Sequence, residues 1–174
     1  DGNTISAAEH TIALMLALSR NVQRGHMELM NGDWNRSSLV GNELKGKTLG
    51  VIGLGRIGRE VIKRAIGLEM KILGFDPYVN QEVFDTELVQ IEDLDTLTKN
   101  SDYITLHIPL LDDTKDLFNK QRFAMMKPSA RIINVARGGI INEKDLSNAL
   151  NDDIIAGAAL DVFFKEPISV DNPL

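Results

Sequence analysis

A glycine-rich turn between an apolar run and an amphipathic segment constrains the fold of this chain more than any other feature. Residues 48–53 form a short apolar run, which is typical of a strand buried in a parallel sheet. The turn Gly53-Leu54-Gly55-Arg56-Ile57-Gly58 overlaps its end, and apolar residues recur at helical spacing over residues 57–68. A strand that passes through a tight glycine turn into a helix opens a βαβ unit, so a parallel sheet is predicted.

The same alternation of strand and helix patterns continues along the chain. Further strands are predicted over residues 71–75, 103–107, 131–135 and 155–162, and further helices over 91–99, 119–126 and 142–150. Before the first strand, a capping box at Ser6-Ala7-Ala8-Glu9 predicts a helix that ends near Gly32-Asp33. The chain has 174 residues, which is about the length of one domain. These patterns predict an α/β fold, namely a Rossmann-type doubly wound parallel sheet with a long N-terminal helix.

The glycine turn has the spacing of a phosphate-binding loop. Gly53 allows the tight turn, Gly55 lets a pyrophosphate approach the backbone, and Gly58 lets the helix pack closely on the strand. Asp76 lies 18 residues beyond Gly58, at the end of the next predicted strand. A carboxylate there accepts hydrogen bonds from an adenosine ribose and repels a 2′-phosphate, so NAD rather than NADP is the predicted cofactor. A structural glycine turn followed by an Asp-Pro turn is the alternative.

A second glycine motif lies just upstream. Residues 41–48 (GNELKGKT) match the P-loop pattern G-x-x-x-x-G-K-[ST] letter for letter. A working P-loop joins a strand to a helix so that backbone amides converge on phosphate. Here Lys47-Thr48 opens a predicted strand, and nothing strand-like precedes Gly41. A nucleotide hydrolase of this class is therefore disfavoured, and ATP binding would test it.

Further candidates lie where predicted strands end, which is where open α/β sheets bind ligands. They are His107, Arg137, Asp161 and Glu166. The planar guanidinium of Arg137 beside two glycines suits a carboxylate, with a solvated arginine as the alternative. Glu166 is equally compatible with an exposed turn carboxylate. His107 is expected to line the cleft rather than to carry protons, whereas His10, in the first helix, is expected to be structural.

Composition narrows the classes of function. Lys and Arg number 19 against 25 Asp and Glu, and the net charge of −6 disfavours a nucleic-acid or anionic-membrane surface. The absence of cysteine excludes disulfides, cysteine-ligated metals and thiol catalysis, and it fits a reducing compartment such as the cytoplasm. No metal site is expected.

The apolar part of the first helix predicts an interface. Residues 12–18 are apolar on every face, but they are far fewer than the ~20 residues that a membrane span needs. One face is expected to pack on its own domain and another on a second copy of the chain. A homodimer through the N-terminal helix region is therefore predicted, with coverage of that face by a further domain as the alternative.

Several stretches together resemble the NAD-dependent D-2-hydroxyacid dehydrogenases. They are residues 53–58, 74–77, 106–110, 126–128, 133–139, 159–163 and 166–167, in the same order as in the family. The resemblance implies that a hydride passes between C2 of a 2-hydroxy acid and a nicotinamide. It implies that Arg137 holds the substrate's carboxylate and keto oxygen. It also implies that Glu166 orients and charge-stabilises a histidine that exchanges the hydroxyl proton.

For the cofactor, the resemblance implies a further set of contacts. Asp161 would meet the carboxamide end of NAD. Arg56 and Ile57 would present backbone to the pyrophosphate. The cleft would be lined by Ile108, Val135 and Ala136.

The family's proton-carrying histidine follows the Glu-Pro segment after one more strand, whereas this chain ends earlier, at Leu174. We therefore expect residues 1–174 to be the NAD-binding domain of a longer two-domain chain, and to be inactive without the substrate domain. Residues 2–9 and 47–61 are most similar to the branch of the family that oxidises 3-phospho-D-glycerate to 3-phosphooxypyruvate in serine biosynthesis. An NAD-sensing corepressor module on the same fold is the alternative, because such proteins can keep both Arg137 and Glu166.

Overall fold

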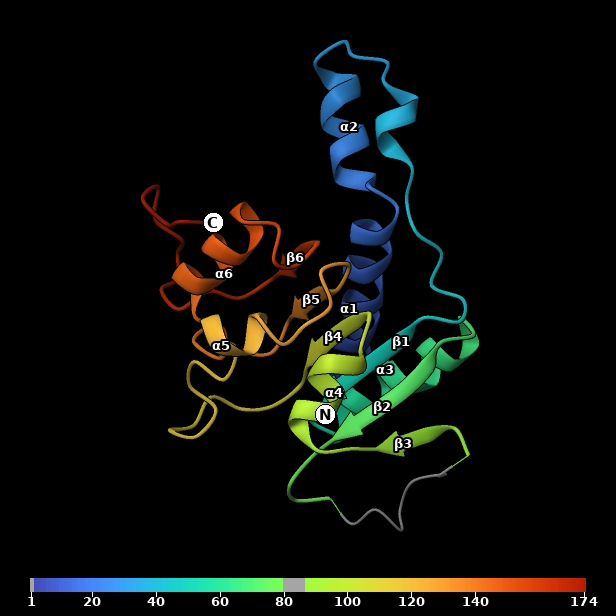
Figure 1. The fold of residues 1–174 in the computed structure, drawn as a ribbon, viewed down its shortest axis with the longest axis vertical. Helices are drawn as coiled ribbons and strands as arrows, with labels where there is room; N and C mark the ends of the chain where they lie inside the picture. Colours follow the sequence, from blue (N-terminus) through green and yellow to red (C-terminus); the bar gives the residue numbers. More distant parts are fainter. Residues whose placement is uncertain (1, 80–86) are drawn as a thin grey trace.

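The computed structural model describes residues 2–79 and 87–174, and six parallel strands of this part form one central sheet (Figure 1). The strands are β1 (Thr48–Ile52), β2 (Lys71–Phe75), β3 (Val89–Ile91), β4 (Tyr103–Leu106), β5 (Arg131–Asn134) and β6 (Gly157–Leu160). Their order in the sheet is β3-β2-β1-β4-β5-β6, and every neighbouring pair is parallel. The chain builds outward from β1 in both directions, so the topological switch point lies between β1 and β4.

Helices cover both faces of the sheet. The helices are α1 (Thr4–Ser19), α3 (Arg56–Gly67), α4 (Leu94–Asn100), α5 (Lys120–Phe123) and α6 (Glu143–Asn151). α1 and α3 pack on one face, where Met15 and Val61 are fully buried. α4, α5 and α6 cover the other face, where Leu97, Phe123 and Leu146 are buried. The predicted fold, a Rossmann-type doubly wound parallel sheet with a long N-terminal helix, is confirmed.

The central strands are apolar because both of their faces are covered. In β1, Leu49 and Val51 belong to the core under α1 and α3, whereas Ile52 belongs to the core under α4, α5 and α6. At Gly50, α4 packs directly on the strand, since a Cβ there would lie 2.6 Å from the Leu97 side chain. This burial on both sides produces the continuous apolar run from which β1 was predicted.

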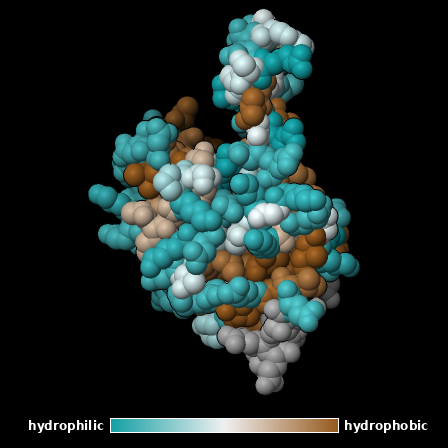
Figure 2. Space-filling model, turned by 45° about the vertical axis from the view of Figure 1, so that its right-hand side comes forward, coloured by the Kyte–Doolittle hydropathy of each residue, from teal (hydrophilic) through white to brown (hydrophobic). Residues whose placement is uncertain are grey.

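The N-terminal region differs from the single long helix that the sequence predicted. α1 begins at Thr4, two residues before the predicted cap, and Ser6 Oγ donates to the Asn3 carbonyl oxygen instead of capping an amide. α1 ends at Ser19, because Asn21 takes up the left-handed conformation (φ 55°) and a new helix, α2 (Val22–Met30), starts after it. α2 and the 3-10 helix η1 (Arg36–Leu39) form an arm that stands away from the body (Figures 1 and 2).

Other boundaries also differ from the sequence prediction. The helix predicted over residues 91–99 begins later, at Leu94, because the Asp93 side chain caps it by accepting from the amides of Asp95 and Thr96. The residues just before it form β3, which was not predicted and which pairs with β2 over three residues. The helix predicted over 119–126 is limited to a single turn in α5, and the strand predicted over 155–162 is limited to β6.

The P-loop match at residues 41–48 does not lie between a strand and a helix. Residues 40–47 contain neither strand nor helix and lead directly into β1, so the P-loop match lacks the strand–loop–helix context that phosphate binding requires.

Within the described residues, no helix has the length and apolar character needed to cross a membrane.

Candidate functional site

The glycine turn after β1 is shaped by contacts between backbones. Gly53 has φ +97°, and a Cβ there would lie 2.4 Å from the His107 carbonyl oxygen at the end of β4. A Cβ on Gly58 would lie 2.0 Å from the Gly53 carbonyl oxygen, so α3 and β1 approach more closely than any side chain allows. Gly55, by contrast, faces open space, with no described atom within 4 Å of its would-be Cβ. The two outer glycines are therefore structural, and the middle one leaves a bare backbone surface.

That bare surface lies at the start of α3. Gly55 is the N-cap residue of α3, and within the described residues no side-chain hydrogen bond caps this helix. The first amides of a helix have no partners within the helix and carry its partial positive charge, which makes them donors for phosphate oxygens. The described residues therefore fit a pyrophosphate approaching Gly55.

Asp76 is held against the glycine turn. Its Oδ2 accepts a hydrogen bond from the Leu54 amide at 2.8 Å, and its Oδ1 accepts one from the Tyr78 amide at 2.9 Å. The first bond joins the turns that follow β1 and β2, since Leu54 and Asp76 are 22 residues apart in sequence. Together the two bonds hold the partly buried carboxylate in one orientation. Each oxygen accepts only one of these bonds and retains a lone pair, so the carboxylate can still accept from a ribose hydroxyl.

The end of β4 places His107 beside the turn. The His107 amide donates to the Ile52 carbonyl oxygen at 2.7 Å, and its ring Nε2 lies 2.9 Å from Thr105 Oγ1. Burial lowers the pKa of His107 to about 4, so the ring is neutral at physiological pH. The next residue, Ile108, also borders the turn, since a Cβ on Gly53 would lie 2.9 Å from Ile108 Cγ2. A neutral histidine packed beside the glycine turn agrees with a lining role rather than with proton transfer.

The turn after β5 is organised by a residue that sequence analysis did not single out. Asn134 is only 2% exposed; its Oδ1 accepts from the Ala136 amide at 3.0 Å and its Nδ2 donates to the Arg137 carbonyl oxygen at 2.9 Å. Arg137 itself is exposed, and its Nη1 donates to the Ala136 carbonyl oxygen. A polar amide at the end of a buried strand was the available signal. Asn134 therefore positions the backbone of Val135, Ala136 and Arg137.

Arg137 and Glu166 line the same depression. It has a volume of about 370 Å³ and is bordered by Ala136, Arg137, Gly138, Val162, Phe163, Phe164 and Glu166. Glu166 Oε1 accepts from the Phe163 amide at 3.0 Å, which closes a turn within the loop after β6. The structure thus brings these two residues, 29 apart in sequence, to one hollow at the carboxyl edge of the sheet. A larger hollow of about 640 Å³, which includes Thr48 and Lys71 at the amino ends of β1 and β2, contains none of the predicted site residues.

Asp161, at the end of β6, has a partner that the sequence did not indicate. Its Oδ1 lies 3.3 Å from His10 Nε2, and both side chains are about half exposed. α1 runs antiparallel to β6, with Leu18 near Gly157 and His10 near Asp161. His10 was expected to be structural only, and no local pattern could have placed it at this edge of the sheet.

The fold and this edge together define a dinucleotide-binding domain: a doubly wound sheet, a glycine turn at the switch point and an acidic residue after the second strand. The model of the D-isomer specific 2-hydroxyacid dehydrogenase, NAD binding domain matches residues 12–174. The chain therefore belongs to the D-isomer specific 2-hydroxyacid dehydrogenase family.

Individual relatives agree with this assignment. The chain is 49% identical, over its whole length, to D-3-phosphoglycerate dehydrogenase of Methanocaldococcus jannaschii, and 49% identical over 99% of its length to the enzyme of that name from Archaeoglobus fulgidus. The chain spans about a third (33%) of the length of each of these two relatives. Among solved structures, NAD-dependent formate dehydrogenase from Staphylococcus aureus in complex with NAD superposes with a TM-score of 0.92, at 37% identity, covering 99% of this chain and 52% of that one.

The contrast between the glycines predicts separable effects on stability and binding. Gly58→Ala should destabilise the fold by about 3 kcal/mol or more, because the added Cβ meets backbone that cannot move aside. Gly55→Ala should change the free energy of unfolding by only about 0.5 kcal/mol, yet weaken NADH binding about tenfold by filling the bare surface. Urea unfolding and NADH fluorescence titration measure the two quantities, and undiminished binding by Gly55→Ala would contradict this account of the turn.

The neutral His107 predicts a loss of stability on acidification. Because its folded pKa, about 4, lies below the unfolded value of 6.5, the unfolded chain binds the extra proton between these pH values. Stability should therefore be full above pH 6.5 and fall by about 1–3 kcal/mol as the pH drops toward 4. His107→Gln should remove this part of the pH dependence in urea unfolding. A wild-type and a variant curve that stay parallel across this range would show that burial does not hold His107 neutral.

Proposed function

We propose that this chain is the cofactor-binding domain of an enzyme that oxidises a D-2-hydroxy acid with NAD, and that its substrate is 3-phospho-D-glycerate, oxidised to 3-phosphooxypyruvate. The proposal rests on one observation, which is that Arg137 and Glu166 border the same hollow. This hollow lies at the edge of the sheet where the glycine turn also lies. Support for the substrate comes from the relatives named D-3-phosphoglycerate dehydrogenase, which match the whole chain at close to half identity. The place of such a reaction in serine biosynthesis belongs to the same proposal.

The described residues suit NAD along the carboxyl edge of the sheet. The amides of Arg56 and Ile57 and the bare backbone at Gly55 would receive the pyrophosphate, between the structural glycines Gly53 and Gly58. The Asp76 carboxylate would accept hydrogen bonds from the hydroxyls of the adenosine ribose. The remaining contacts would come from Ile108, Val135 and Ala136 along the cleft and from Asp161 at the carboxamide end.

Two charged residues would serve the substrate. Bound NAD supplies the hydride acceptor for C2. The exposed guanidinium of Arg137 uses Nη1 on the Ala136 carbonyl oxygen and would offer its other donors to the substrate's carboxylate and keto oxygen. Asn134 holds the Arg137 backbone. Glu166 would orient a histidine and stabilise its positive charge while that ring takes the hydroxyl proton.

The proton-carrying histidine and the substrate domain are proposed to lie in a longer chain of which residues 1–174 are the NAD-binding domain. The length comparison supports this division, since the chain spans about a third of the curated relatives. Turnover by the full-length protein would separate the dehydrogenase from an NAD-sensing corepressor module. The cytoplasmic location inferred from the sequence stays a prediction.

Replacing the ribose acceptor tests the cofactor assignment. Wild-type chain should bind NADH, and Asp76→Ala should weaken that binding about ten- to a hundredfold, the value of roughly 1.5–3 kcal/mol for hydrogen bonds to a charged group. NADPH binding should suffer less or improve, because the charge that repels a 2′-phosphate is gone. Calorimetry with both cofactors measures the difference, with Asp33→Ala on the arm as a charge-matched control. Equal losses for both cofactors would mean that Asp76 is only a turn residue.

The same preparation tests the domain assignment. With NADH bound, the isolated chain should give no measurable turnover of 3-phosphoglycerate or other 2-hydroxy acids. Loss of a positioned acid–base group costs about 10²–10⁴-fold, and loss of the substrate domain removes orientation as well. Robust turnover by this chain alone would contradict the proposal that the proton carrier lies elsewhere.

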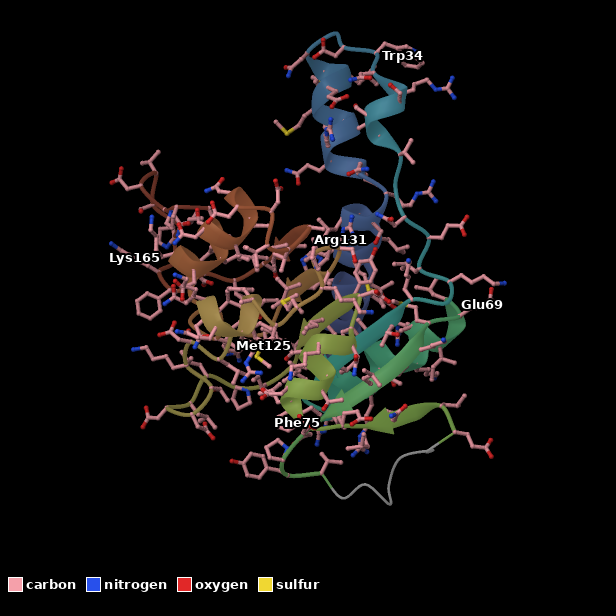
Figure 3. All side chains as sticks on the ribbon, in the orientation of Figure 1. Trp34, Glu69, Phe75, Met125, Arg131 and Lys165 are labelled. Atoms are coloured by element: carbon pink, nitrogen blue, oxygen red, sulfur yellow. The ribbon has the colours of Figure 1, made fainter. Side chains whose placement is uncertain are left out.

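The N-terminal helices are proposed to form a homodimer. Exposed apolar side chains concentrate on the arm: Val22, Met27, Leu29, Met30, Trp34 and Val40. Beside the arm, Leu14, Ala17 and Leu18 of α1 border a hollow of about 290 Å³ together with β6. Trp34 lies at the outer end of the arm and is 77% exposed (Figure 3). Apolar surface of this kind on a projecting element supports association with a second copy.

Light scattering should therefore give a mass near twice 19.2 kDa at micromolar concentration. Because Trp34 is the only tryptophan, its fluorescence should shift to shorter wavelength as the chain associates. A Leu29→Glu/Met30→Glu variant should remain monomeric, whereas Lys144→Glu on α6 should behave as wild type. A clean monomer of the wild-type chain at high concentration would contradict the dimer.

A further inference from the structure

One carboxylate on α6 holds the loop that carries Glu166. Glu143 is the first residue of α6; its Oε1 accepts from the Phe164 amide at 2.6 Å and its Oε2 accepts from Asn172 Nδ2 at 2.7 Å. Both oxygens thus bind the segment that follows β6, at points eight residues apart. Lys165, between these points, carries its side chain away from the body (Figure 3). The loop is therefore fixed through its backbone and through Asn172 rather than by burial of its own charged side chain.

The same loop is in backbone contact with the turn that carries Arg137. A Cβ on Gly138 would lie 1.9 Å from the Phe163 carbonyl oxygen, so only glycine permits the two backbones to meet. The Phe163 amide in turn donates to Glu166 Oε1 at 3.0 Å. Phe163 and Phe164 thus form a junction that Gly138, Glu143 and Glu166 all contact. The groups that hold this junction in place also determine the position of Glu166 relative to Arg137.

Glu143 is not the residue that caps α6. First-turn carboxylates commonly stabilise a helix by capping it or by opposing its dipole. In α6 the cap is Asn142, whose side chain accepts from the Asp145 amide at 3.0 Å. Both Glu143 oxygens bind groups outside the helix instead. Hydrogen bonds to an ionised carboxylate are among the stronger ones in proteins.

We infer that Glu143 is a positioning residue for Glu166, because it clamps the Phe163–Phe164 junction that holds the Glu166 loop against the Arg137 turn. The inference rests on the proposed function, which gives Arg137 and Glu166 their roles. Glu143 does not border the hollow that Arg137 and Glu166 line. It acts through the loop, and the glycine turn and Asp76 lie on other strands.

Amide hydrogen exchange on this chain tests the clamp directly. Glu143→Ala should raise the exchange rate of the Phe164 amide, and of Phe163 with it, about ten- to a hundredfold, as expected for losing bonds to a charged acceptor. Glu143→Gln should show a smaller increase, since its amide oxygen can still accept one bond. Lys144→Ala, the exposed neighbour on α6, is the control and should leave both rates unchanged. Unchanged exchange in both Glu143 variants would overturn the inference.

A double-mutant cycle in the full-length protein separates positioning from general stability. Glu143→Ala should lower kcat about ten- to a hundredfold while the Kd for NADH stays within about twofold. When Glu143→Ala is combined with Glu166→Gln, kcat should fall little further than in Glu166→Gln alone, because the carboxylate that Glu143 positions is already absent. If the fold-decreases in kcat of the two single variants multiply in the double variant, Glu143 has a general structural role and the inference is overturned. Failure of the wild-type chain to bind NADH would instead overturn the proposed function, and hydrogen exchange would still decide the clamp.

Discussion

The close approach of three backbones at the end of β1 is the constraint on which the rest of the candidate site depends. Gly53 lies against the His107 carbonyl, and Gly58 lies against the carbonyl of Gly53, at separations that no side chain permits. These contacts bring the start of α3 to the switch point between β1 and β4, where a helix N-terminus can act on a ligand. The Asp76 carboxylate is then held beside the turn by the Leu54 amide. Without these contacts, α3 could not begin so close to the ends of β1 and β4.

Polar side chains organise the loops that leave this edge. Asn134 is almost fully buried and uses both ends of its amide on the Ala136–Arg137 turn, while Glu143 uses both oxygens on the loop after β6. A buried or ionised polar group of this kind is costly to leave unpaired, so each one favours a single loop conformation. The exposed groups with proposed chemistry, Arg137 and Glu166, therefore lie on loops whose backbones are hydrogen-bonded to Asn134 and Glu143. Such bonds matter because displacement of a reacting group by about 1 Å can cost two orders of magnitude in rate.

The division between cofactor and substrate recognition follows from the same architecture. Proteins named formate dehydrogenase and D-3-phosphoglycerate dehydrogenase share this domain, although formate and phosphoglycerate differ in size and charge. In the proposed function, the described edge of the sheet holds the nucleotide and contributes Arg137 and Glu166 to the substrate. This agrees with the proposal that the groups selecting the substrate lie in another part of the full-length protein.

The sequence alone was sufficient for features that depend on neighbouring residues. The run through β1, the three glycines and Asp76 predicted the βαβ unit and its cofactor class, because strand burial, turn geometry and helix spacing all leave local patterns. It was insufficient for β3, whose three residues become a strand only by pairing with β2, and for the break at Asn21, which depends on one left-handed residue. The partnerships of His10 with Asp161, and of Glu143 with Phe164 and Asn172, also needed the tertiary structure. They join residues that are far apart in the chain, and it is the order of strands in the sheet, rather than any local pattern, that brings those residues together.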